Sequence, residues 1–141
     1  MTVLAEAVLI MTMNIYHEAR GESLAGQQAV ADTVITRVCD ARWPDSVKGV
    51  VLQRKQFSWV KEKRVKNVFD LMALQDAILH SKKTKPQEIE AYRRAEKIAR
   101  KVLQDGYKPR NKFTHFHTTK VHPYWARYKG LWVGNHIFYR M

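Results

Sequence analysis

The 141-residue sequence contains a single cysteine, Cys39, and no long apolar run. One cysteine excludes an intramolecular disulfide and a zinc site with two cysteine ligands. The longest largely apolar stretch, Ala7–Met13, has seven residues, whereas a membrane span requires roughly 18–20. That stretch follows Glu6 and has no Lys or Arg before it, so the basic n-region of a Sec signal peptide is missing. We therefore expect synthesis in the cytoplasm and no transmembrane segment.

Glycine and proline are also sparse, with six and four residues, and no Gly-, Ser- or Pro-rich stretch is long enough to be a linker. The sequence has no internal repeat and no low-complexity tract. Hydrophobic residues make up 45% of the chain and aromatic residues 11%, which argues against wholesale disorder. The length is that of one domain, so we expect a single domain over residues 1–141 and, by default, a monomer.

Positive charge is in excess: 25 Lys and Arg residues against 13 Asp and Glu residues give a net charge of +12 and a pI near 10.0. Such a surface attracts a polyanion, which could be nucleic acid, an anionic membrane or the bacterial cell envelope. The sequence contains no RNP1 pattern, GXXG loop or Cys/His finger spacing. We therefore expect attraction to the anionic cell envelope and no specific nucleic-acid partner. The basic residues fall mainly in Lys61–Lys66, Lys82–Lys85, Arg93–Lys101 and Lys108–Lys112.

Helical periodicity dominates the first hundred residues. The segment Gln53–Asn67 is an exception, because it is basic and irregular and predicts no regular element. Thr84 and Gln87 have the spacing of a capping box at the start of the last helix. The predicted helices are Val3 to about Arg20, Ser23 to about Ala41, a short one through Val47–Val51, Phe69–His80, and one from near Pro86 to Gly106.

The C-terminal 30 or so residues differ in character, since aromatic residues and histidines crowd together there. Trp132–Phe138 has the pattern of two short strands joined by a Gly-Asn turn. The sequence therefore predicts a mainly α, α+β fold: a helical body with a small antiparallel sheet near the C-terminus.

Tyr16–Glu22 contains two glutamates in different local positions. If the first helix ends near Gly21, Glu18 lies in its last turn, where the helix dipole disfavours a negative charge. Flanking apolar groups would add desolvation, so we expect a raised pKa for Glu18. A carboxyl group that stays protonated near neutrality can donate a proton to a departing sugar oxygen, as a glycosidase requires. The alternative is that both glutamates are surface charges, with Glu18 paired to Arg20.

Histidines in the tail raise the question of a metal site. His115 and His117 fall on the same side of a predicted strand, with His122 close by, and a catalytic zinc needs three protein ligands. No His-Glu-x-x-His motif is present, so we interpret these histidines as structural or substrate-contacting and predict no metal and no cofactor. Cys39 has no nearby Lys or other partner that would activate it, so we expect a buried structural thiol.

Several short motifs, taken in their order and spacing, resemble the catalytic domain of SleB-type cell wall hydrolases. This family includes the spore cortex-lytic enzymes and also occurs in phages. The resemblance runs from about Leu4 to Arg140, which is nearly the whole chain. The motifs are Asn14-Ile-Tyr-His-Glu-Ala-Arg-Gly-Glu22, Gly26-Gln27, Trp43-Pro44, Gln56-Phe57-Ser58, Thr114-His-Phe-His117 and Gly134-Asn-His-Ile-Phe-Tyr-Arg140.

The resemblance implies a lysozyme-like helical fold and cleavage of the peptidoglycan glycan strand. The spore enzymes are lytic transglycosylases, which cut between N-acetylmuramic acid and N-acetylglucosamine and leave a 1,6-anhydro product. The family's catalytic glutamate corresponds to Glu18. The absence of a wall-binding repeat and the basic insert after Trp59 favour a phage-type lysin that acts in the periplasm or cell wall. The substrate-binding residues implied by the resemblance are Glu22, Gln56, Phe57, Ser58, His117, Trp125 and Tyr139.

Three alternatives stay open at this point. A hydrolytic muramidase would need a second carboxylate, for which Glu22, Asp32 and Asp45 are the nearby candidates by sequence. An N-acetylmuramoyl-L-alanine amidase would use zinc and leave the glycan intact. A basic module that binds the envelope or nucleic acid without catalysis would show salt-sensitive retention.

Overall fold

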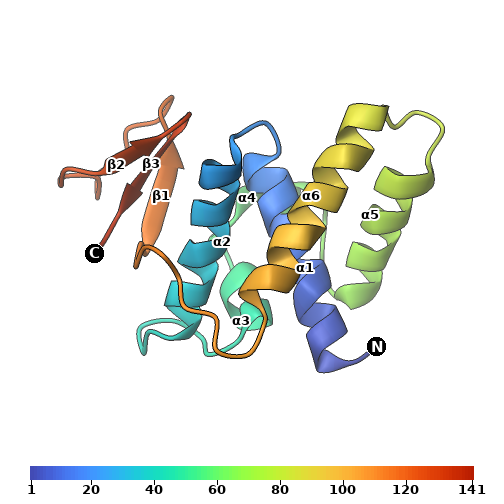
Figure 1. Ribbon diagram of the computed structural model, residues 1–141, viewed down its shortest axis with the longest axis horizontal. Helices are drawn as coiled ribbons and strands as arrows, with labels where there is room; N and C mark the ends of the chain where they lie inside the picture. The colour runs from blue at the N-terminus through green and yellow to red at the C-terminus, as the bar shows by residue number, and fades with distance from the viewer.

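The computed structural model describes residues 1–141 as six helices followed by three strands (Figure 1). The helices are packed together, and the strands form a small sheet at one end of the molecule. This arrangement confirms the predicted mainly α, α+β fold with a C-terminal antiparallel sheet. The elements are α1 (Val3–Ala19), α2 (Leu24–Val38), α3 (Val47–Val51), α4 (Ser58–Glu62), α5 (Val68–His80), α6 (Pro86–Val102), β1 (His115–Thr118), β2 (Leu131–Val133) and β3 (His136–Tyr139).

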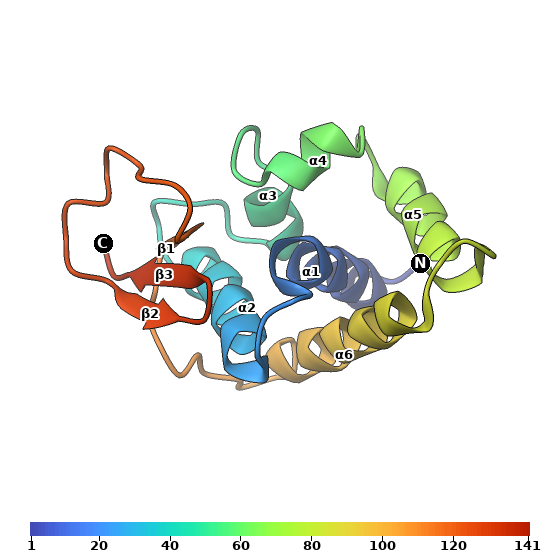
Figure 2. The same ribbon diagram turned by 90° about the horizontal axis from the view of Figure 1, so that it is seen from above.

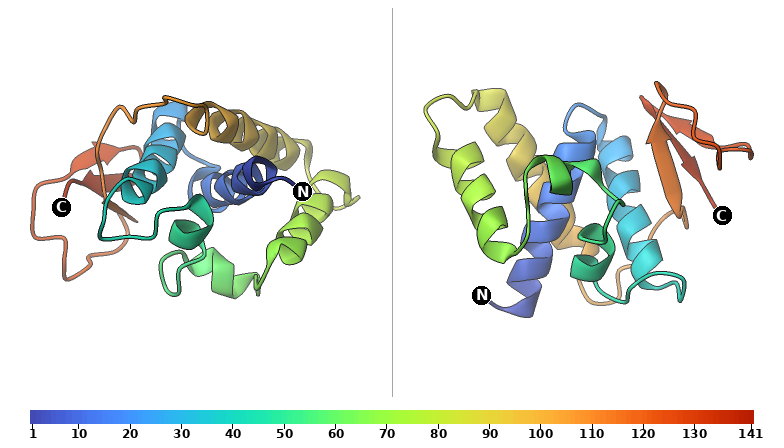
Figure 3. Two further views of the ribbon diagram at one scale, coloured as in Figure 1. Left: turned by 90° about the horizontal axis from the view of Figure 1, so that it is seen from below. Right: turned by 180° about the vertical axis from the view of Figure 1, so that it is seen from behind.

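α1 is the central helix of the fold. It begins where the Thr2 side chain accepts a hydrogen bond from the N–H of Ala5 at 3.0 Å. α2, α3, α5 and α6 all contact it (Figure 2). Figures 2 and 3 agree that α6 lies on one side of α1 and α3 and α4 on the other. Enclosure on several sides explains why residues 8–16 of α1 are all buried and mostly apolar, with Ile10, Met11, Met13 and Ile15 fully buried. No helix combines the length and the hydropathy that a membrane crossing requires.

α6 separates its side chains into an apolar face and a charged face. The buried residues recur at helical spacing, and the Tyr92 hydroxyl donates to Gln75 Oε1 of α5 at 2.7 Å. The Lys and Arg side chains lie on the outer face, so burial of α6 against α1, α2 and α5 leaves a basic helix surface. The buried residues are Tyr92, Ala95, Ile98, Ala99 and Val102.

The predicted capping box on this last helix is wrong. Lys85 is the N-cap residue and no side chain caps it. The hydroxyl of Thr84 instead donates to the carbonyl of Ala77 at 3.1 Å, which ties the turn to the end of α5. A capping box does form on α5, where the side chains of Asn67 and Asp70 each accept the other's backbone N–H.

The sheet has the strand order β1-β3-β2, and both pairings are antiparallel. β2 and β3 form the predicted hairpin, with Gly134 at φ +58° in the turn, a conformation that glycine adopts without strain. All four residues of β3 are buried because the sheet packs against the helices. Phe138, Phe113, Ala19, Ala29 and Val30 form a second apolar cluster of five buried residues beside the main cluster of 21.

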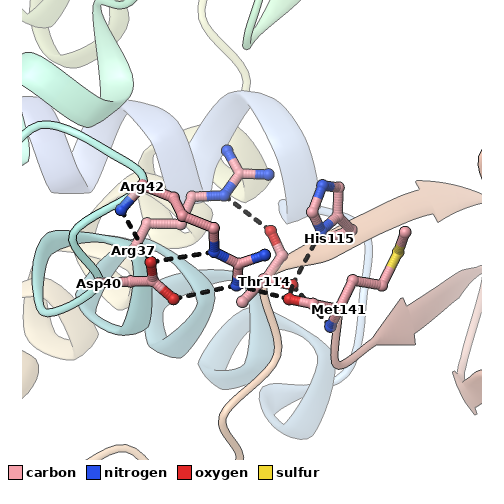
Figure 4. Close-up of polar contacts among 6 residues, drawn as sticks. All are labelled: Arg37, Asp40, Arg42, Thr114, His115 and Met141. Atoms are coloured by element: carbon pink, nitrogen blue, oxygen red, sulfur yellow. Dashed lines mark hydrogen bonds and ion pairs between the residues drawn. The ribbon is translucent and has the colours of Figure 1, made fainter.

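Polar contacts also join the sheet to the C-terminal end of α2 (Figure 4). The buried guanidinium of Arg37 donates from Nε to the carbonyl of Thr114 at 2.7 Å. The Thr114 hydroxyl accepts the N–H of Met141 at 3.0 Å, and Arg42 donates to the Met141 carbonyl at 2.5 Å. The start of β1 and the last residue of the chain are therefore fastened to one helix end.

Two other local predictions are wrong. The segment predicted to be irregular contains α4, whose five residues are too few to show apolar periodicity and whose N-cap residue, Phe57, has no capping side chain. Cys39 is exposed, not buried, because α2 ends at Val38 instead of continuing to about Ala41.

The position of α1 predicts where a cavity is most costly. Met11→Ala should lower the free energy of unfolding by about 2–5 kcal/mol, because the methionine is fully buried. The matched change Met72→Ala on α5, where the side chain is 41% exposed, should cost no more than about 0.5 kcal/mol. Urea unfolding followed by circular dichroism measures both, and equal losses would contradict the central role of α1.

Candidate active site

A cleft of about 1200 Å³ lies where the end of α1, the segment around α4 and the sheet meet. We call it the central cleft. α1 contributes Glu18 and α2 contributes Arg37, while the sheet contributes His117 and His136. Residues 52–66 supply most of the remaining wall. The cleft therefore collects side chains that are far apart in the sequence.

The predicted site residues divide into two groups by position. Glu18, Gln56, Phe57, Ser58 and His117 all line the central cleft. The other predicted substrate-binding residues are not part of its lining, and each instead contacts a residue that is. These are Glu22, Trp125 and Tyr139.

Glu18 lies in the last turn of α1, as predicted. Burial, together with the nearby negative charge of Glu62, raises its pKa to about 7. Glu62 is the last residue of α4, the helix that the sequence did not reveal. Near neutral pH the carboxyl group is therefore poised between its acid and base forms, as a general acid/base requires.

Stacked rings join the end of α1 to α4. The ring of His17 stacks on Trp59 with 4.8 Å between centroids, and Trp59 Nε1 donates to Asn14 Oδ1 at 2.9 Å. Burial, together with the positive charges of Lys63 and Arg20, lowers the pKa of His17 to about 4, so its imidazole is neutral at physiological pH. These contacts hold α4 over the end of α1 and sustain the low polarity around Glu18.

Arg37 positions Gln56 at the edge of the cleft. One terminal nitrogen of the guanidinium donates to Gln56 Oε1 at 3.0 Å, while Nε bonds to the start of β1. Burial lowers the pKa of Arg37 to about 10, which leaves it charged at neutral pH. The rings of Trp43 and Phe57 lie 5.3 Å and 5.8 Å from the guanidinium carbon. Sequence reasoning did not select Arg37, because its role depends on partners 19 and 77 residues away.

Glu22 connects the β2–β3 turn to the helices. Its carboxylate accepts the backbone N–H of Asn135 at 2.7 Å and the side-chain amide of Asn135 at 3.2 Å, and lies 3.2 Å from Nδ1 of His136. Burial alone would raise the pKa of Glu22, but the hydrogen bonds from Asn135 and His136 outweigh it, and the pKa lies below its ordinary value. A Cβ on Gly134 would stand 2.8 Å from Glu22 Oε1, so a side chain there would push the carboxylate away from Asn135.

The contact with Glu22 fixes the position of His136 in the wall of the central cleft. Only 3% of the residue is exposed, and its Nε2 atom is buried without a hydrogen-bond partner. Nδ1 faces Glu22, and this contact holds the imidazole in that wall. No sequence pattern distinguished this histidine from the other five.

His117 is held in the cleft by the two aromatic residues predicted with it. Its Nε2 atom lies 2.8 Å from the hydroxyl of Tyr139, whose ring stacks on the imidazole at 5.4 Å. Trp125 packs edge-on against both rings, at 5.6 Å from His117 and 5.5 Å from Tyr139. Trp125 and Tyr139 therefore support His117 from behind the cleft wall.

Comparison with known proteins assigns the chain to a family. The sequence profile of the family described as Cell Wall Hydrolase matches residues 21–139. The chain belongs to this family. The match covers most of the chain and begins just after Glu18, so the evidence for Glu18 is the geometry of the site.

Curated relatives and solved structures agree with this assignment. The spore cortex-lytic enzymes of Oceanobacillus iheyensis and Bacillus cereus are 36% and 34% identical to this chain over 58 residues. Those segments make up 41% of this chain and 21% and 22% of the two relatives, so the match spans about a fifth of the relatives' length.

Two solved structures of catalytic domains share the fold. The catalytic domain of the Bacillus cereus SleB protein superposes with a TM-score of 0.62 at 22% identity, over 96% of this chain and 91% of that chain. The catalytic domain of the germination-specific lytic transglycosylase SleB from Bacillus anthracis gives 0.61 at 21% identity, over 96% and 94%. The predicted SleB-type family, with its cell wall hydrolase class, is confirmed.

Within this member of the cell wall hydrolase family, the carboxylates of the cleft differ from those predicted. Glu62 and Asp70 line the central cleft together with Glu18. Asp32 is fully buried elsewhere, where it accepts a hydrogen bond from the Tyr107 hydroxyl, and Asp45 is not part of the lining. A second carboxylate near Glu18 therefore comes from α4 or α5.

The zinc alternative finds no ligand set in this fold. No group of three or more His, Cys, Asp or Glu side chains lies close enough together to hold a metal ion. His115 Nδ1 bonds to the Thr114 hydroxyl at 2.8 Å, and both ring nitrogens of His117 have partners. The two histidines thus serve the sheet and the cleft wall separately.

The environment of Glu18 predicts a measurable titration. Its carboxyl carbon should titrate near pH 7 in a side-chain NMR experiment, because burial and Glu62 both disfavour the anion. Glu62→Gln should move this midpoint to lower pH, since the repulsive charge is gone. Glu6→Gln, which changes a glutamate at the other end of the same helix, should leave it in place. A midpoint at the ordinary glutamate value of 4.5 would contradict the buried placement.

Proposed function

We propose that this chain is a lytic transglycosylase that cleaves the peptidoglycan glycan strand between N-acetylmuramic acid and N-acetylglucosamine, with Glu18 as its acid/base. The observation that carries the proposal is a carboxyl group with a pKa of about 7 on the wall of an open cleft in a cell wall hydrolase fold. The likeness to a domain described as a lytic transglycosylase supports the same reaction.

In the first step Glu18 acts as an acid. It donates its proton to the oxygen that links the two sugars, the bond from that oxygen to C1 of the muramoyl residue breaks, and positive charge develops on the muramoyl ring. The glycan end that departs carries the donated proton. Glu62 and Asp70 line the same cleft and can favour the developing positive charge electrostatically.

In the second step Glu18 acts as a base. The C6 hydroxyl of the same muramoyl residue attacks C1, and Glu18 takes up the hydroxyl proton, which returns the enzyme to its starting state. The ring closes as a 1,6-anhydro sugar, and no water is consumed. One acid/base residue is sufficient because the substrate supplies its own nucleophile.

The other cleft residues are proposed to hold the sugars. Gln56, fixed by Arg37, can hydrogen-bond to hydroxyl and acetamido groups through its side-chain amide. His117 and Ser58 add polar groups to the same lining. Phe57 is buried beneath them and supports the floor of the site.

The basic lining of the cleft suits the rest of the polymer. Arg54, Lys55 and Lys61 lie on the cleft wall, where they can face the carboxylates of the stem peptides. We place the action of the enzyme at the cell wall or periplasm, as for a phage-type lysin. The proposed active unit is the monomer, because one chain supplies the whole cleft.

A hydrolytic muramidase is a second candidate, favoured by one observation. The charge of Glu62 reaches Glu18 strongly enough to raise its pKa, so a second carboxylate is near the acid. In an inverting or retaining hydrolase that group would activate water or attack C1.

Product analysis separates the two reactions. Peptidoglycan with intact stem peptides is digested, treated with borohydride and examined by mass spectrometry. The proposal predicts muropeptides that resist reduction and weigh one water less than the hydrolysis products. Reducible muramic acid ends would instead establish the muramidase, and intact glycan with freed stem peptides would establish an amidase.

Removal of the acid should abolish turnover without unfolding the chain. Glu18→Gln should lower the rate of glycan cleavage by roughly 10²–10⁴-fold, the usual contribution of general acid–base catalysis. The control Glu6→Gln lies on the same helix and should retain the parent rate. Circular dichroism establishes that both variants are folded, and substantial activity in a folded Glu18→Gln variant would refute the assignment.

The rate of cleavage should also fall as the pH rises above the pKa of Glu18. The first step needs the protonated form of Glu18, so kcat/KM on a soluble glycan fragment should fall above about pH 7, by roughly tenfold per pH unit. In Glu62→Gln this falling limb should move to lower pH, together with the titration of Glu18. A falling limb that stays in place in that variant would mean that another group titrates.

A further inference from the structure

A second recess of about 1140 Å³ lies away from the central cleft, between the first half of α2, the outer face of α6 and residues 104–111. We call it the α2–α6 groove. Because α6 lies across α1 from α3 and α4 (Figure 2), this groove and the central cleft occupy different sides of the molecule. Six of its 15 lining residues are basic and two are acidic. The basic residues are Arg93, Arg94, Lys97, Arg100, Lys101 and Arg110.

Half of these cations are free of any ion pair. Arg93 and Arg100 share Glu96, and Arg94 pairs with Glu90 at 2.9 Å. Lys97, Lys101 and Arg110 have no acidic partner within 4.0 Å. The groove therefore presents uncompensated positive charge to solvent.

The two acidic lining residues offset only part of the positive charge of the groove. Glu90 is already paired with Arg94. Asp32 is fully buried at the base of the groove, where it accepts hydrogen bonds from the hydroxyl of Tyr107 at 2.5 Å and from Gln28 Nε2 at 3.2 Å. The backbone N–H of Arg110 also donates to Asp32 at 3.4 Å, so this network anchors the segment that carries Arg110 beside α2.

Several of the cations form a row along α6. Arg93, Lys97 and Lys101 follow one another at four-residue intervals, which places them about 6 Å apart along one face of α6. Arg110 belongs to the opposite wall, on the segment tied to α2. A linear polymer with an anion in each repeat would meet these charges in succession. Peptidoglycan carries its carboxylates on side peptides, so its glycan strand is a poorer match.

We propose that the α2–α6 groove binds a linear phosphodiester polymer whose repeats carry no bases. The three unpaired cations can each contact a phosphate, and the planar guanidinium of Arg110 can bind two phosphate oxygens at once. The apolar lining consists of Leu24, Ala25, Ala29 and Ile98, with no aromatic ring on which a base could stack. The apolar face of α6 is buried against other helices, so the helix has none left to insert into a membrane.

Such a site goes beyond the proposed cleavage reaction. It would hold the enzyme on an anionic wall polymer while the central cleft, on another side, engages the glycan. Its binding can be measured with a catalytically silent protein, so the failure of either proposal is distinguishable from the failure of the other.

The test uses the full chain carrying Glu18→Gln and poly(glycerol phosphate) as the probe, with binding followed by calorimetry at several salt concentrations. Lys97→Gln/Lys101→Gln/Arg110→Gln should weaken binding by roughly tenfold or more and flatten its dependence on salt, since three phosphate contacts are lost. The matched control, Lys82→Gln/Lys83→Gln/Lys85→Gln, removes the same charge from an exposed loop outside the groove and should change binding much less.

Four results would overturn the proposal. Equal losses in the two triple variants would mean that net charge alone attracts the polymer. Tighter binding to a single-stranded oligonucleotide, to polyglutamate or to anionic lipid vesicles than to poly(glycerol phosphate) would assign the groove to another class of partner.

Glycan cleavage by the groove variant, tested with Glu18 restored on fragments free of phosphate polymer, should equal that of the parent chain.

Discussion

The burial of α1 among four other helices is the constraint on which the rest of this structure depends. Every residue in the middle of that helix is enclosed, so its direction and its end are fixed by packing from several sides. The end of α1 is the place where the helical body meets the sheet, and Glu18 lies in that last turn. A rigid helix therefore places the carboxyl group of Glu18 at the edge of the core, on the lining of the central cleft.

The two glutamates of the first helix–turn–helix corner show how environment separates identical side chains. The carboxyl group of Glu18 is buried and lies near the negative charge of Glu62, so its pKa rises to about 7. Glu22, four residues later, is surrounded by donors from the β2–β3 turn, and its pKa falls. The first is suited to proton transfer, whereas the second remains an anion that orients His136 and the hairpin. Neither role could be exchanged without rebuilding the contacts around both.

Much of the fold was predictable because it depends on local patterns. The apolar periodicity of α1, α2, α5 and α6 and the Gly-Asn turn between β2 and β3 identified the main elements from the sequence. α4 was missed because it is stabilised by the stacking of Trp59 on His17 and not by any pattern of its own five residues. The capping box assigned to Thr84 failed for a similar reason, since that hydroxyl has a better acceptor at the end of α5.

The site was predictable only where one element sufficed. The position of Glu18 at a helix end could be deduced locally, and so could the expectation of a raised pKa. The contribution of Glu62, the clamp of Arg37 on Gln56 and the contact of Glu22 with His136 all arise from residues brought together across long stretches of chain. A resemblance to a family supplied Gln56, Phe57, Ser58 and His117 as cleft residues, but it did not separate them from Trp125 and Tyr139, which stand behind the wall.

The presence of two apolar clusters of unequal size has a consequence for the mobility of the molecule. The sheet belongs mainly to the small cluster of five residues and is fastened to the helices by polar contacts such as those of Arg37 and Glu22. Its amide hydrogens should accordingly exchange with solvent before those of α1, whose opening requires the large cluster to come apart. The central cleft is lined from both parts, so its sheet wall should open to solvent more readily than the wall that α1 supplies.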